Sequence, residues 1–446
     1  TGDPAYEIWA WNAEDGTPLP GWPVLMNKFC WATPALGDLD HDGLDEVVIP
    51  SANGNLYVFN HDGTGFLNPD GTFAWLHASW DYGSAAIVDI DRDRDLEIVC
   101  PSRSDSVYCY NADGSAVPGW PVNVNGDARG SVAVGDVSGN GLIEVVASSN
   151  SGEVWLFTSG GQVFPNWPMT CPQMDDFASS PTLADLDGDG DLEIIIVSAV
   201  IPGGNETLHV WTWEGDVFPG DWPQTMLDPP TTDKRSSASV GDIDDDPNME
   251  IIVGSANGKV YAFDTDGSVL DGWPIQTDGE IHASATLADL DLDGDIEVVV
   301  AGLDGWVYVW DTEGDYADGE GVEWGNFRHN ARRTGYYNYE LEVGVPGGES
   351  WTASGVKLDQ NMPNPFNPIT TISYAVPDGG ADVELAVYNV SGARVTTLVS
   401  GRVPAGRATV TWNGTDANGA QVASGTYFVR LSAENTLLTR KVVLLK

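Results

Sequence analysis

Side-chain oxygens recur at a fixed spacing in six short stretches of the sequence, and this spacing is typical of a metal-binding loop. In the first stretch Asp38, Asp40, Asp42 and Glu46 stand at positions 1, 3, 5 and 9, with Gly43 at position 6. Carboxylates this close repel one another, by about 1 kcal/mol per pair at roughly 4 Å even in water, unless a cation lies between them. Hard oxygen ligands around a glycine turn suit Ca²⁺, whereas Mg²⁺ prefers fewer protein ligands and more water.

We therefore predict up to six calcium ions, one in each loop, bound by the side chains at positions 1, 3, 5 and 9 and by the main-chain carbonyl at position 7. The short length of the loop and its flanking strands exclude an EF-hand, which is longer and lies between two helices. The predicted ligands are Asp38, Asp40, Asp42, Leu44 and Glu46; Asp89, Asp91, Asp93, Asp95 and Glu97; Asp136, Ser138, Asn140, Leu142 and Glu144; Asp185, Asp187, Asp189, Asp191 and Glu193; Asp242, Asp244, Asp246, Asn248 and Glu250; Asp289, Asp291, Asp293, Asp295 and Glu297.

Three of the loops depart from this pattern. The third offers Ser138 and Asn140 in place of carboxylates, so we expect weaker binding there. In the second, Arg94 occupies the glycine position and disfavours the turn. In the fifth, Pro247 stands there and cannot adopt positive φ, so its geometry differs or its site is impaired.

The loops mark the repeats of a longer unit, because their first aspartates lie 47 to 57 residues apart. In the first repeat a small-residue strand is predicted at 32–37, a β-branched strand at 46–49 and an alternating strand at 56–60. Most repeats close with a Trp-Pro pair such as Trp120-Pro121. Short antiparallel strands without helical periodicity predict a β-propeller, and a solenoid of stacked hairpins is the alternative.

The number of blades is six or seven, because the chain begins with half a repeat. Residues 6–11, with Trp22-Pro23, resemble the second half of a unit that precedes the first acidic loop. They either complete a seventh position, which we favour, or add an outer edge to a ring of six. We expect residues 323–337 to finish the last blade and to plug the ring; a basic site for acidic partners is the alternative for this segment.

Charge divides the chain near residue 350. Residues 357–446 carry 8 basic and 6 acidic residues, so residues 1–356 carry 11 basic and 61 acidic ones, for a total net charge of −48. We predict a propeller at 1–337, a linker at 338–356 and a second domain at 357–446. The acidity excludes nucleic acid as a partner; bound cations explain it, or else a solvated acidic face suited to solubility or to a saline habitat.

The second domain is predicted to be an immunoglobulin-like β-sandwich without its disulfide, so the whole chain is expected to be all-β. Its alternating strands are predicted at 370–375, 383–388, 394–399, 408–412, 425–431 and 437–445.

Cysteine usage and hydropathy bound the cellular context. The four cysteines, Cys30, Cys100, Cys109 and Cys171, are too few for a disulfide scaffold. Cys100 and Cys109 are expected on adjacent strands, either as a disulfide or as buried free thiols. No apolar run is long enough for a transmembrane helix. The sequence starts at Thr1 without a signal peptide, as expected of a processed or truncated terminus.

The loops resemble the FG-GAP/VCBS repeats of integrin-type β-propellers over residues 1–337, with Glu in place of the usual Asp at position 9. The last domain is similar to FlgD-like immunoglobulin tails, which act as C-terminal sorting domains of the type IX secretion system. This resemblance implies export to the cell surface or the medium, and such tails are usually removed on export. The residues that carry it are 360–368, Val387-Tyr388, 412–414, 425–427 and 441–446.

No catalytic motif stands out. The six histidines form no His-Glu-x-x-His pattern, and among 67 acidic residues no pair can be selected as a glycosidase dyad. We therefore expect a secreted, calcium-binding, non-catalytic protein that serves in adhesion or as an extracellular building block, with an extracellular protein or polysaccharide as its unidentified partner. The alternatives are a carbohydrate-binding or carbohydrate-active propeller, a region processed from a larger secreted enzyme, and self-assembly through the open edge of the half-repeat.

Overall fold

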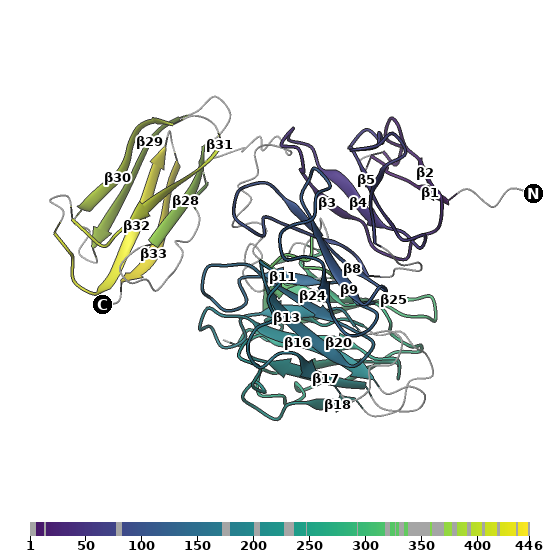
Figure 1. The fold of residues 1–446 in the computed structure, drawn as a ribbon. Helices are drawn as coiled ribbons and strands as arrows, with labels where there is room; N and C mark the ends of the chain where they lie inside the picture. Colours follow the sequence, from purple (N-terminus) through teal and green to yellow (C-terminus); the bar gives the residue numbers. More distant parts are fainter. Residues whose placement is uncertain are drawn as a thin grey trace, which may run out of the picture. The chain divides into compact units, whose positions relative to one another are not determined.

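The structure is a computed structural model in which every regular element is a β-strand (Figure 1). Its chain forms two compact units, Thr1–Pro346 and Gly347–Lys446, and the predicted linker at 338–356 lies outside the described residues. The described residues are 6–12, 15–76, 83–171, 179–199, 206–226, 236–246, 248–291, 293–316, 322–325, 327–329, 334–337, 357–358, 370–376, 381–389, 394–403, 406–416, 420–433 and 436–444.

The first unit repeats one ladder of antiparallel strands, which confirms the predicted propeller architecture. Consecutive strands pair in chain order in each sheet, from a short inner strand to an outer one. Four of the sheets have four strands each. The first two comprise β3(Ala35–Gly37), β4(Glu46–Pro50), β5(Asn55–Phe59) and β6(Thr72–Trp75), and β7(Ala86–Val88), β8(Glu97–Ser102), β9(Ser106–Tyr110) and β10(Val122–Asn123). The next two comprise β11(Ala133–Gly135), β12(Glu144–Ser148), β13(Glu153–Thr158) and β14(Met169–Thr170), and β15(Thr182–Ala184), β16(Glu193–Ala199), β17(Glu206–Trp211) and β18(Gln224–Met226).

Two further sheets follow the same order with differences at their ends. The fifth gains a strand beside its first one, and the sixth has three strands in the described part of the chain. They comprise β19(Ser239–Gly241), β20(Glu250–Gly254), β21(Lys259–Phe263) and β22(Ile275–Gln276), and β23(Thr286–Ala288), β24(Asp295–Ala301) and β25(Val307–Asp315).

The register of the first two strands places each acidic loop identically. The last residue of the first strand pairs with the glutamate that ends the loop, as Gly37 pairs with Glu46 and Val88 with Glu97. The same pairing recurs at Glu144, Glu193, Glu250 and Glu297. Each loop therefore connects the innermost pair of strands of its sheet.

The half-repeat forms a two-stranded sheet of β1(Tyr6–Ile8) and β2(Val24–Met26). Its Trp22 and Val24 pack in one cluster with Tyr57 and Phe59 of β5, on the first complete sheet. This is the contact that a preceding blade would make. The choice between seven positions and six stays a prediction.

The described parts of residues 322–337 contact the first strands of several sheets, as a central plug would. β26(Val322–Trp324) pairs with β19, so the prediction that this segment finishes the last blade is wrong. Farther along, Val134 N donates to the carbonyl of Gly335 at 2.8 Å, and Ile87 N to that of Thr334 at 3.1 Å. The described part of the segment thus links β7, β11 and β19.

Aromatic side chains pack the sheets against one another. In β5 the rings of Tyr57 and Phe59 lie parallel with centroids 6.1 Å apart, and Trp22 meets Phe59 edge-on at 6.3 Å. The tryptophans of the other Trp-Pro pairs pack edge-on in the same way against the next sheet, in the pairs Trp120–Phe157, Trp167–Trp211, Trp222–Phe263 and Trp273–Trp310. The Trp-Pro repeats therefore serve packing between blades.

The second unit is a two-sheet β-sandwich, as predicted. Its core includes Leu385, Trp412 and Val429, which are all buried. One sheet has the order β27(Lys357–Leu358), β28(Thr370–Val376), β31(Gly406–Trp412), and the other β30(Arg394–Val403), β29(Ala381–Asn389), β32(Gly425–Ala433), β33(Thr436–Leu444).

The structure contradicts a disulfide between Cys100 and Cys109, because all four cysteines are free. Cys109 pairs with Val99, and Cys100 with Tyr108. The two thiols are therefore one register step apart and lie in different core clusters on opposite faces of the sheet. The alternative of buried free thiols is confirmed for this pair.

Candidate metal-binding loops

Each acidic loop is wrapped around the carboxylate of its first aspartate. In the first loop Asp38 accepts the N–H of Asp42 at 3.1 Å and that of Gly43 at 3.0 Å. Asp42 in turn accepts the N–H of Leu44 at 2.8 Å. The bond from position 7 to the side chain at position 5 recurs in every loop, at Asp93, Asn140, Asp189, Asp246 and Asp293. The sequence pattern therefore folds each loop locally, before any metal ion is considered.

The residue at position 6 adopts positive φ whether it is glycine or arginine. Gly43 has φ +89° and Gly190 +98°, as expected for glycine. Arg94 adopts φ +83° at the same position. The turn therefore forms although we expected arginine to disfavour it. Pro247 lies outside the described residues, but Asn248 N still donates to Asp246 at 2.7 Å.

The glutamate at position 9 is buried and binds the start of its own loop. Glu46 accepts the N–H of Leu39 at 2.8 Å, and Glu97 that of Ile90 at 2.9 Å. Glu193, Glu250 and Glu297 bind the residue at position 2 in the same way. In the third loop Glu144 instead accepts the N–H of Ser138 at 3.1 Å.

Some of the buried loop oxygens lack a hydrogen bond. In the described part of the chain Glu46 Oε1 and Asp244 Oδ1 are buried without a hydrogen-bond partner. An unsatisfied buried oxygen of this kind is costly unless a cation binds it. These carboxylate oxygens fit a hard cation such as Ca²⁺.

Burial and neighbouring carboxylates shift the titration of these residues. Burial first, and then the repulsion of nearby aspartates, raises the pKa of Glu46 to about 8. The same causes raise the pKa values of Glu97, Glu193 and Glu250 to about 8. Each loop glutamate with such a pKa therefore requires a proton or a cation at neutral pH.

The structure brings many of the predicted ligands together. Among the described residues, ligand atoms lie within 4.8 Å of one another in several groups of carboxylates. These groups include Asp38, Asp40 and Asp42; Asp89, Asp91 and Glu97; Asp185, Asp187 and Glu193; and Asp242, Asp244 and Glu250. The part played by the carbonyl at position 7 stays a prediction.

Two side chains at position 7 have other partners. Asp95 accepts a hydrogen bond from the ring of His41 at 2.9 Å, which joins the first loop to the second. Asp191 accepts the indole N–H of Trp213 at 2.7 Å. Asp95 and Asp191 therefore contact neighbouring segments through their carboxylates.

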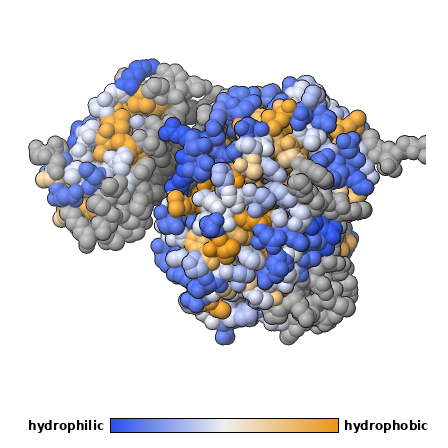
Figure 2. All heavy atoms as spheres, viewed as in Figure 1, coloured by the Kyte–Doolittle hydropathy of each residue, from blue (hydrophilic) through white to orange (hydrophobic). Residues whose placement is uncertain are grey.

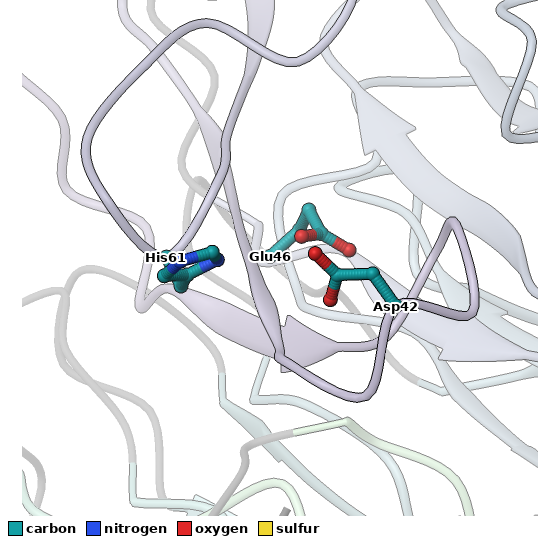
Figure 3. Close-up of side chains that lie close together, drawn as sticks. All are labelled: Asp42, Glu46 and His61. Atoms are coloured by element: carbon teal, nitrogen blue, oxygen red, sulfur yellow. The ribbon is translucent and has the colours of Figure 1, made fainter.

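One residue near the loops was missed in the sequence. His61 stands in the Asp-Gly turn after β5, and one of its ring nitrogens lies within 4.8 Å of carboxylate oxygens of Asp42 and Glu46 (Figure 3). Its fixed place in the repeat, two residues before Gly63, is the signal that could have identified it.

The described residues include no helix, and hence none of the length and hydropathy needed to cross a membrane. The molecular face in Figure 2 is largely hydrophilic, with smaller apolar patches between the polar residues.

Comparison with known families agrees with both halves of the chain. The FG-GAP-like repeat model matches residues 38–100 and 136–196, and the FlgD Ig-like domain model matches residues 368–436. No curated protein matches the sequence.

Solved structures with low similarity include three bacterial proteins. BamB from Moraxella catarrhalis is 16% identical over 68% of this chain and 78% of its own, with a TM-score of 0.43. The V. cholerae biofilm matrix protein Bap1 is 15% identical over 99% of this chain and 69% of its own, with a TM-score of 0.35. PorZ, a surface component of the type IX secretion system of Porphyromonas gingivalis, is 15% identical over 93% and 51%, with a TM-score of 0.31. On its family matches and its own architecture, the chain combines a β-propeller that contains FG-GAP-like repeats with a C-terminal FlgD Ig-like domain.

Proposed function

We propose that this protein is a secreted or cell-surface building block, non-catalytic and adhesive or structural, whose propeller is stabilised by up to six calcium ions. The recurring buried glutamate at position 9 is the observation that carries the proposal. Burial, and then the charges of neighbouring carboxylates, raise the pKa values of Glu46, Glu97, Glu193 and Glu250 to about 8. A divalent cation in each loop would stabilise the ionised form and hold the first two strands of its sheet together.

Repetition supports a structural role for the ions. Six loops with one pattern of hydrogen bonds distribute the predicted metal sites around the ring instead of concentrating chemistry at one place. An extracellular setting, where calcium is plentiful, suits such loops. The FlgD Ig-like domain supports export, because the sequence resembles the sorting tails of the type IX system.

Thermal unfolding tests the calcium proposal. We expect the melting temperature of the full chain to fall by many degrees when calcium is removed with a chelator, and to recover when calcium, but not an equal concentration of magnesium, is restored. A melting temperature that is the same with and without chelator would overturn the proposal. Fractionation of the producing cells, followed by mass spectrometry of the C-terminus, tests export and tail removal.

Self-association is a second candidate function, favoured by two exposed apolar faces. Val307 and Val309 of β25 correspond in the repeat to Leu56 and Val58, which are fully buried against the next sheet. In β25 they are 63% and 50% exposed. The last sheet thus presents a blade face without a packed neighbour.

The half-repeat presents the opposite face. Trp9 and Trp11 correspond to Tyr57 and Phe59, yet they are 40% and 55% exposed and stack on each other at 5.4 Å. Among the described strands β1 pairs with β2 alone, although a third strand of the repeat normally pairs with a second one as well. We infer that a second copy of the chain covers these faces and pairs with the open edge of β1.

Sedimentation velocity over a range of protein concentrations tests this second candidate. We expect oligomers that dissociate in the variant Val307→Asp, whereas Val217→Asp, at a valine 54% exposed in a turn, should leave association unchanged. A monomer at every concentration in saturating calcium would remove the idea. Retention on a polysaccharide column by that monomer would point instead to carbohydrate binding by the exposed tryptophans.

A further inference from the structure

In the first acidic loop an imidazole from the turn after β5 lies beside two of the loop's own carboxylates. We propose that His61, Asp42 and Glu46 bind a divalent transition metal ion of the Zn²⁺ class. One ligand atom from each lies within 4.8 Å of the other two. Figure 3 shows the two carboxylates facing each other, with the ring of His61 beside them. Zinc binds nitrogen and oxygen at about 2.0–2.2 Å, so the three ligand atoms would move closer together when an ion binds.

The burial and hydrogen bonding of Glu46 indicate that the cluster of His61, Asp42 and Glu46 binds a cation. Its side chain is fully buried, with a relative exposure of 0%. Oε2 accepts the N–H of Leu39, whereas Oε1 has no hydrogen-bond partner. A buried carboxylate oxygen in this state requires a proton or a metal ion, and the cluster with His61 and Asp42 supplies the further ligands that an ion needs.

The position of His61 in the repeat provides a second line of evidence. In the fourth sheet the equivalent residue is Trp213, and its indole N–H reaches Asp191 of the acidic loop at 2.7 Å. A side chain at this position therefore contacts the loop of its own sheet. The backbone of His61 is held in place by Trp22, whose Nε1 donates to the His61 carbonyl at 2.9 Å. The other repeats have Ala112, Ser159, Thr265 and Thr312 there, none of which offers a nitrogen ligand.

The ligand types select the metal. Calcium binds oxygen, whereas imidazole nitrogen suits zinc, copper, nickel and iron. One imidazole and two carboxylates form a three-ligand set that leaves room for water on a tetrahedral ion. Asp42 and His61 are both exposed, which leaves the proposed metal site open to solvent. Asp42 and Glu46 are also predicted calcium ligands, so the two ions compete in the first loop. The inference holds whether or not the other loops bind calcium.

Zinc titration of the full chain in millimolar calcium, against a chromophoric zinc chelator, tests the site. We expect one tight site in the natural sequence, weakened about 100-fold in His61→Ala and in His61→Gln, since even the loss of an outer-shell partner costs about 10–100-fold. X-ray absorption of the zinc-loaded protein should show imidazole in the coordination shell, and His61→Gln should lose it.

Two other histidines serve as matched controls. His41 lies in the same loop, 2.9 Å from Asp95, and His282 lies 3.0 Å from Glu280. His41→Ala and His282→Ala should keep the zinc affinity of the natural sequence. Absence of zinc uptake in calcium, or equal affinity in His61→Ala, would overturn the inference. The calcium dependence of the melting temperature, recorded on the same variants, reports on the proposed structural calcium sites separately.

Discussion

The indole nitrogen of Trp22 donates a hydrogen bond of 2.9 Å to the main-chain carbonyl of His61, across 39 residues of sequence. Here the tryptophan that closes one repeat binds the backbone of the next sheet. The bond therefore ties consecutive sheets together by a backbone contact that is independent of the identity of the accepting residue. It recurs between Trp120 and Ser159, Trp167 and Trp213, and Trp222 and Thr265.

Removing this bond should destabilise the propeller by a modest, separable amount. We expect Trp167→Phe to lower the free energy of unfolding by about 1 kcal/mol, because one hydrogen bond is lost while most of the packing is retained. Trp167→Ala should cost about 3–5 kcal/mol, because the packing on Trp211 is lost as well. Urea denaturation monitored by circular dichroism measures both. Trp306→Phe, at a side chain 67% exposed, is the control and should change the free energy by less than about 0.5 kcal/mol.

The buried loop glutamates should couple stability to calcium. Glu193→Gln should remove the stabilisation contributed by one ion, about 2.7 kcal/mol at a calcium concentration near 100 times the Kd. In chelator the same variant should differ little from the natural sequence, because an amide resembles the protonated acid. The exposed Glu214→Gln serves as the matched control. An equal loss with and without calcium would contradict the assignment of Glu193 as a ligand.

The fall of stability with rising pH should appear in the chelated protein and disappear in the calcium-loaded one. Burial raises the pKa of Glu46, Glu97, Glu193 and Glu250 to about 8 from an ordinary value of 4.5. The folded chain without calcium therefore binds more protons than the unfolded chain between these values, and its stability should fall as the pH rises from about 5 to 8. With calcium bound the glutamates are ionised in the folded chain, as they largely are in the unfolded chain above about pH 5, so stability should change little over the same range. Melting temperatures at several pH values, with and without chelator, check the sign.

Thiol reactivity should report the absence of disulfides. Cys100, Cys109 and Cys171 are buried, and burial raises the pKa of Cys171 to about 12 and that of Cys109 well above its ordinary value. Cys30 is only half-buried, although burial also raises its pKa. We expect a thiol reagent to modify Cys30 first and slowly in the native protein, and all four cysteines after unfolding without reductant. Fewer than four reactive thiols in the unfolded protein would reveal a disulfide.

The sequence predicted the repeats and the loops because both depend on local interactions. Alternating aspartates accept hydrogen bonds from the backbone of their own loop, as Asp38 does from Asp42 and Gly43, so the loop needs few distant partners. Arg94 shows the limit of this reasoning. Its positive φ is unfavourable in isolation, yet the surrounding strands and the bonds from Asp89 keep the turn.

Strand register decides whether Cys100 and Cys109 face each other. Cys100 and Cys109 occupy adjacent strands as expected, but the turn between β8 and β9 pairs Ser102 with Ser106. This pairing places Cys100 opposite Tyr108 and sends the two thiols to opposite faces. A shift of one residue reverses the face of a side chain, and the sequence around the turn did not specify it.

The sequence by itself determined the class of fold, the six acidic loops and the second domain, because period, turn chemistry and alternation are properties of neighbouring residues. Only the tertiary structure decided that β26 joins β19, that Trp22 binds the backbone of His61, and that His61 meets Asp42 and Glu46. Each of these contacts joins segments whose approach depends on how the sheets pack and how their strands align. Local sequence patterns therefore could not predict these contacts, which form only in the assembled sheets.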